Sequence, residues 1–148
     1  MFSKLYQIVK SNALTLITEN NIVPLKFKDA AINEASGTIV DVLKSQMESG
    51  KFKDVLRFFQ TSGIDNNALI NIGINKYANR LNRHYNINID AAKEISVALI
   101  PPAMKQFVAS TETSETKESA MFSVLNWLSG NTINFEKMLS RMNTLQIA

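Results

Sequence analysis

Apolar residues recur along this chain at spacings of three and four, which is the period of amphipathic helices. Runs of alternating Val, Ile and Thr residues, which are typical of strands, are rare. The three prolines and five glycines stand mostly between these periodic stretches and mark their ends. The pattern predicts an all-α fold, a compact bundle of about seven to eight short helices.

The N-terminal half contains four predicted helices, which cover about residues 3–19, 28–48, 52–60 and 66–85. Gly37 lies within the second helix, where a missing side chain would permit close helix contact, and Gly50 is its predicted C-terminal cap. Asp65 is the predicted N-cap of the fourth helix. The predicted inward residues share the helical spacing: Phe2, Leu5, Tyr6, Val9, Ala13, Leu16, Ala31, Ile32, Ala35, Ile39, Val42, Leu43, Met47, Phe52, Val55, Leu56, Phe59, Ile70, Ile74, Tyr77 and Leu81.

Two prolines interrupt the next helical stretch. Asp90 is the predicted N-cap of a helix over about residues 91–99. Pro101 has no N–H, and its ring would clash with the preceding turn, so we expect a bend there. Pro102 then fits the first turn of another helix, which ends near Ala109.

The stretch after this helix is nearly devoid of apolar residues. Residues 110–119 read STETSETKES, a composition that indicates a flexible linker. Two further helices, over about residues 120–128 and 134–143, form a predicted C-terminal hairpin. The sequence as a whole predicts a single helical domain over residues 1–148.

The chain contains few of the residues that commonly form catalytic, metal-binding or phosphate-binding sites. The chain has no cysteine, which excludes disulfides, thiolate zinc sites and iron–sulfur clusters. Its single histidine, His84, cannot form a histidine-built metal site and is interpreted as a helix-end residue near the core boundary. The glycines are too isolated for a phosphate-binding loop. We therefore predict no cofactor, no metal and no enzymatic activity.

No apolar stretch of the chain has the pattern of a signal peptide or of a membrane-spanning segment. Lys10, Ser11 and Asn12 interrupt the N-terminal apolar run, so it does not resemble a signal peptide. No stretch reaches the roughly 18 apolar residues of a membrane span. These features predict a cytoplasmic protein, and a net charge of +3 is too small to indicate nucleic-acid binding by itself.

The fourth helix carries the most suggestive polar pattern. No acidic residue occurs between Asn66 and Ile89, and the helix has three cations at spacings of four and three. They are Lys76, Arg80 and Arg83, with Asn79 and Asn82 as auxiliary polar groups. Such a face could contact RNA phosphates and bases. The alternative is a solvated helix face in an asparagine-rich protein.

Two other charged groupings allow similar alternatives. Lys51, Lys53, Arg57 and Phe58 form a candidate second patch, in which Phe58 is either exposed as a partner or stacking contact or packed against another helix. The carboxylates that recur every seven residues in the second helix are interpreted as a solvated face; they are Glu34, Asp41 and Glu48.

Residues 90–107, DAAKEISVALIPPAMKQF, resemble a motif of the YidB-like bacterial domains. The motif contains a capped helix that runs into Leu99-Ile100-Pro101 and a second helix that follows. The resemblance extends over about residues 30–145. It implies a small all-helical fold with no established activity.

The sequence therefore favours a non-enzymatic protein-interaction module that binds a protein partner or associates with itself. The alternative is an RNA- or ribosome-binding protein that uses the basic face of the fourth helix.

Overall fold

The computed structural model describes residues 2–50, 54–55, 57–58 and 67–110. The chain divides into two compact units, Met1–Ala109 and Ser110–Ala148, and the helices below belong to the first. The described residues confirm an all-α fold. The predictions for Asp65, Lys51, Lys53, the linker after Ser110 and the C-terminal hairpin lie outside the described residues.

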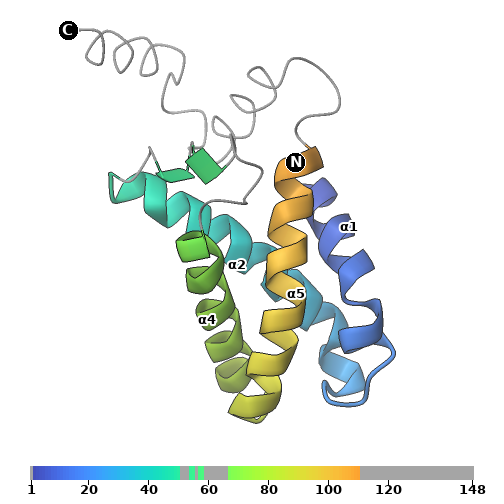
Figure 1. Ribbon diagram of the computed structural model, residues 1–148. Helices are drawn as coiled ribbons and strands as arrows, with labels where there is room; N and C mark the ends of the chain where they lie inside the picture. The colour runs from blue at the N-terminus through green and yellow to red at the C-terminus, as the bar shows by residue number, and fades with distance from the viewer. Residues whose placement is uncertain (1, 51–53, 56, 59–66, 111–148) are drawn as a thin grey trace, which may run out of the picture. The chain divides into compact units, whose positions relative to one another are not determined.

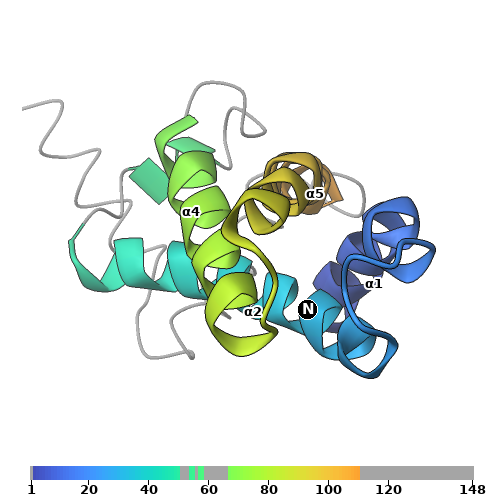
Figure 2. The same cartoon turned by 90° about the horizontal axis from the view of Figure 1, so that it is seen from below.

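The described elements follow one another as a helix-rich chain. They are α1 (Phe2–Asn12), a π-helical turn η1 (Leu14–Thr18), a 3₁₀ turn η2 (Leu25–Phe27), α2 (Lys28–Glu48), α4 (Asn67–His84) and α5 (Ile89–Ser110). Helix α2 contacts both α1 and α4. Figure 1 shows α2 running behind α4 and α5, and Figure 2 shows the same arrangement from below, with α1 at the edge of the bundle.

The first predicted helix changes its hydrogen bonding before it ends. The carbonyl of Ala13 accepts bonds from the N–H groups of both Ile17 and Thr18, at 2.8 and 3.2 Å, which widens the turn. In this turn Ile17, four residues after the buried Ala13, is fully buried, whereas Leu16, which had been expected to face the core, is half-buried.

Helix α2 has the bounds that the sequence predicts. Gly50 follows it with φ of +82°, a backbone conformation that favours glycine, and this confirms Gly50 as the cap. Gly37 has no helix against it, since a Cβ atom added there would meet nothing within 4 Å. The close contact occurs instead at Gly73 of α4, where an added Cβ atom would lie 3.1 Å from a side-chain carbon of Ile100.

The turn between α4 and α5 is built by asparagines. Asn86 has φ of +54°, which ends α4, and the Asn82 side chain donates to the carbonyl of Ile87 at 2.8 Å. The Asn88 side chain accepts from the N–H of Asp90 at 2.8 Å and so caps α5. Asp90 was predicted to be this cap; it lies instead in the first turn of α5.

Helix α5 runs without interruption through Pro101 and Pro102, so the predicted bend between two helices was wrong. The prolines withhold N–H donors from the carbonyls of Val97 and Ala98, four residues earlier. Both of these residues are exposed, which gives their carbonyls access to water. The side chains on both sides of the prolines are buried and hold this one helix against the core; they are Leu99, Ile100, Ala103, Met104, Phe107 and Val108.

Hydrogen bonds between helices supplement the apolar packing. The buried hydroxyl of Tyr77 donates to the carbonyl of Ala31 at 2.8 Å and joins α4 to α2. The hydroxyl of Ser96 donates to the carbonyl of Ile74 at 2.6 Å and joins α5 to α4. No described helix is long and apolar enough to cross a membrane.

Candidate interaction surfaces

Arg80, the central cation of the predicted basic face, is used within the fold. Its guanidinium donates to the Asp41 carboxylate at 2.8 Å and to the Thr38 hydroxyl at 3.0 Å. A guanidinium presents several donors in a fixed plane, which suits it to two acceptors one helical turn apart. Helix α4 itself carries no acidic residue, as its sequence shows, but the acid that pairs with Arg80 comes from α2, which was not anticipated from the sequence.

The hydrogen-bonded network continues into α2. The Thr38 hydroxyl donates to the carbonyl of Glu34 at 2.7 Å and accepts from Arg80. Thr38 is completely buried, while the Arg80 and Asp41 side chains are 25% and 48% exposed. The network therefore runs from the interior to the surface along the α2–α4 interface.

The predicted acidic face of α2 borders α4 instead of facing only solvent. Asp41 pairs with Arg80 across the interface. The carboxylate of Glu34 is close enough to α4 to act on two tyrosines. Burial raises the pKa of Tyr77 and Tyr85 above the usual value, and the negative charge of Glu34 raises both further. Only Glu48, at the end of α2, is fully exposed as predicted.

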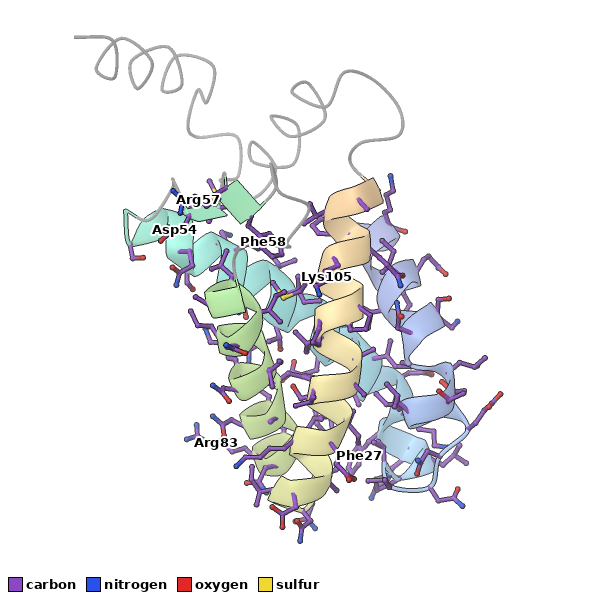
Figure 3. All side chains as sticks on the ribbon, viewed as in Figure 1. Phe27, Asp54, Arg57, Phe58, Arg83 and Lys105 are labelled. Carbon is purple, nitrogen blue, oxygen red and sulfur yellow. The ribbon has the colours of Figure 1, made fainter. Side chains whose placement is uncertain are left out.

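The rest of the basic face is partly available to a partner. Arg83 and Asn79 are exposed, and Lys76 is half-buried. Figure 3 shows the Arg83 side chain directed away from the helices. Asn82, by contrast, has a structural role in the α4–α5 turn. Of the five residues predicted to act together, Arg80 and Asn82 thus form hydrogen bonds within the fold, and Lys76, Asn79 and Arg83 are left as candidate contacts.

The candidate second patch loses its aromatic member. Phe58 is completely buried, which confirms the packed alternative and excludes it as an exposed stacking platform. Arg57 is exposed on the neighbouring position (Figure 3). Lys51 and Lys53 lie outside the described residues.

His84 ends α4 in an exposed position. Its ring meets that of Tyr85 edge to face, with 6.4 Å between the centroids. Among the described residues, no group of three acidic or histidine side chains is placed to hold a metal ion. The position of His84 agrees with a helix-end residue.

An apolar surface on α5 was not anticipated from the sequence. It consists of Val97, Ala98 and Pro101, which we call the α5 outer face, and Val97 is 57% exposed. Because Pro101 was predicted to lie at a bend, these three residues were not predicted to belong to one continuous helix. The prolines were nevertheless the available signal, because two adjacent prolines leave two carbonyls without helical donors.

A second apolar surface joins α1 to α2. Leu14, Ile22 and Leu25 are 50%, 42% and 85% exposed. Periodicity alone does not separate them from core residues, because apolar residues near helix ends normally continue a buried stripe. Only the three-dimensional structure shows that they point outward.

Comparison with protein-family models, curated proteins and solved structures gave no significant match to this chain. The resemblance to YidB-like domains stays a prediction.

Proposed function

We propose that this protein is a non-enzymatic helical module that binds a protein through the α5 outer face, with a second copy of the chain as the first partner to test. The observation that carries the proposal is the 57% exposure of Val97 directly beside Pro101 in a continuous helix. Apolar side chains exposed together on a helix support a role in contact with another molecule.

The backbone of the same segment adds a chemical requirement. The carbonyls of Val97 and Ala98 receive no N–H from Pro101 and Pro102. A partner that covers Val97 would remove water from these acceptors, which is costly unless the partner supplies donors. Backbone amides, asparagine or arginine side chains meet that requirement, and this favours a polypeptide over an apolar ligand.

The non-enzymatic part of the proposal is supported by composition and by the place of the only histidine. The chain has no cysteine, and His84 is exposed beside an aromatic ring. Nucleophilic catalysis by a serine generally requires a base held within hydrogen-bond reach. No hydrogen bond to His84 is seen from a described serine or threonine.

The test is sedimentation velocity over a wide concentration range, combined with site-specific photo-crosslinking from position 97. Self-association predicts a concentration-dependent sedimentation coefficient that Val97→Glu abolishes and Ile72→Glu retains. Ile72 is a matched control because it is also an exposed apolar helix residue, 39% exposed on α4.

If the protein sediments as a monomer, crosslinking in cells decides between a different partner and no partner. A discrete protein adduct from position 97, absent when the photoreactive group is at the exposed position 72 of α4, would support the module. Absence of both self-association and an adduct would overturn the proposal.

RNA binding through α4 is a second proposal, supported by the exposure of Arg83 and the absence of acidic residues from α4. Its contact set is reduced to Lys76, Asn79 and Arg83, since Arg80 is held by Asp41. Fluorescence anisotropy with a labelled single-stranded RNA at low salt tests it. Equal binding by wild type and Lys76→Glu/Arg83→Glu would exclude this site.

A further inference from the structure

The connection between α1 and α2, residues 13–27, exposes three large apolar side chains. Leu25 is the extreme case at 85% exposed, followed by Leu14 at 50% and Ile22 at 42%. Leu25 begins the 3₁₀ turn η2, directly after Pro24. Since exposed apolar area is unfavourable in water, this concentration in one short connection requires an explanation.

Hydrogen bonds hold the connection in shape. The N–H of Ile22 donates to the Asn20 side chain at 2.9 Å, and the N–H of Phe27 donates to the carbonyl of Pro24 at 2.8 Å. The Lys28 ammonium donates to the carbonyl of Thr18 at 2.8 Å and ties the two ends together. The apolar side chains are therefore presented by an ordered segment.

Other side chains of this connection make its contacts with the core. The same region already buries Ala13, Ile17 and Val23 completely. Val23 lies between the exposed Ile22 and the exposed Pro24, so the chain anchors one side chain inward and presents its neighbours outward. The α1 helix thus uses its predicted apolar face for the core, and the exposed residues of the connection are not part of that face.

Positive charge accompanies this surface. Residues 2–29 contain four lysines, at positions 4, 10, 26 and 28, against Glu19 and Asp29, which gives a net charge of 4 − 2 = +2. Lys10 is one helical turn before Leu14, and both are exposed. Lys26 follows Leu25, and its ammonium lies 4.9 Å from the centre of the Phe27 ring. Between Phe2 and Thr18 there is no acidic residue at all.

We propose that this connection binds the surface of an anionic lipid bilayer. Leu25 and Ile22 enter the boundary between headgroups and acyl chains, while Lys10 and Lys26 contact the phosphate headgroups. Charge complementarity selects the anionic surface. Side chains that protrude from a turn also suit a deformable bilayer, which needs no pocket shaped to receive them. The proposal is independent of the α5 outer face.

The experiment is co-sedimentation of the full chain with vesicles of phosphatidylcholine and phosphatidylserine at a ratio of about 3:1, which approximates the anionic content of a cytoplasmic leaflet. Vesicles of pure phosphatidylcholine are the neutral control. Wild type should partition at least several-fold more strongly onto the anionic vesicles, and raised salt should weaken this binding. The variants Leu25→Ser and Lys10→Gln/Lys26→Gln should each bind about tenfold more weakly.

The matched controls are Ile72→Ser on α4 and the double variant Lys93→Gln/Lys105→Gln on α5, which make comparable chemical changes at exposed positions. They should bind like wild type, and circular dichroism should show that all variants are folded. Failure of wild type to bind anionic vesicles, or an equal loss in these control variants, would overturn the proposal. A protein crosslinked from position 25 without vesicle binding would overturn it as well, because the surface would then serve a protein partner.

Discussion

Arg80 of α4 and Asp41 of α2 form an ion pair at 2.8 Å, so one cation of the most suggestive sequence pattern is part of the fold. The pair takes one residue from each of two sequence patterns, the basic residues of α4 and the acidic residues of α2. It lies where these two helices pack against each other. A stripe of charge on a helix can thus reflect a neighbouring helix rather than an external ligand.

Arg80→Ala should lower the free energy of unfolding by about 1 kcal/mol, because it removes the ion pair and leaves Thr38 without its donor. Lys76→Ala, which removes a neighbouring cation without a described partner, should change it by less than about 0.5 kcal/mol. Urea denaturation measures both. A double-mutant cycle of Arg80→Ala with Asp41→Ala should give a coupling of about 0.5–1 kcal/mol that decreases in high salt. A coupling of zero would show that the pair is not stabilising.

The two tyrosines that reach α2 offer a matched comparison. Tyr77 donates to Ala31 at 2.8 Å from a buried position, whereas Tyr85 donates to Ala30 at 3.4 Å from a more exposed one. Tyr77→Phe should therefore cost about 1 kcal/mol of stability, and Tyr85→Phe less than about half of that. Equal costs measured by urea denaturation would contradict this assignment.

Tyr77 should also make the protein sensitive to alkali. Burial raises the folded-state pKa of Tyr77 above its ordinary value of 10.0. Because the folded pKa is the higher one, stability is fully present below the unfolded-state value and is lost as pH rises above it, when only the unfolded chain ionises. Denaturation midpoints should fall above about pH 10. In Tyr77→Phe this fall should be smaller, and an unchanged pH profile would refute the role of Tyr77.

Much of the fold could be predicted from local sequence. Helix α2 has its expected ends because its apolar spacing, Pro24 before it and Gly50 after it all agree. The errors arose where tertiary packing overrides local preference. Pro101 does not break α5, since Leu99, Ile100 and Ala103 are buried around it. In the widened turn after α1, Ile17 is fully buried and Leu16 only half-buried.

The candidate surfaces were less predictable than the fold. Periodicity identifies which residues share a helix face but not which neighbour that face meets. Arg80 was thus predicted to be available to a partner, and Phe58 was predicted to be either exposed or packed. In the structure Arg80 pairs with Asp41 of α2, and Phe58 is buried. Leu25 shows the opposite case, because an apolar residue in a turn gives no sequence signal of whether it points inward.

Gly37 and Gly73 should respond differently to the same substitutions. Gly37→Ala should stabilise the protein by about 1 kcal/mol, because alanine is the better helix former and its Cβ atom meets nothing within 4 Å. At Gly73 the added carbon lies 3.1 Å from Ile100 and 3.4 Å from Met104, so Gly73→Ala should gain less. Gly73→Leu should destabilise by about 1–3 kcal/mol through overpacking. Thermal and urea denaturation of the three variants would test this order, and a tolerated leucine at position 73 would disprove the close approach of α4 and α5.

The prolines of α5 provide the last test, which bears on both the fold and the proposed function. If α5 is one continuous helix, Pro101→Ala restores a donor to the Val97 carbonyl and relieves the clash of the ring with the preceding turn. The alanine variant also gives the unfolded chain more freedom, which offsets part of the gain. We expect a net stabilisation of about 1–2 kcal/mol by urea denaturation. A bend between two separate helices would instead make the variant neutral or destabilised.

If the free carbonyl serves a partner, the more stable variant should bind that partner less well, so stability and the position-97 crosslink should change in opposite directions. If stability and crosslinking instead change in the same direction, the prolines take no part in binding the partner.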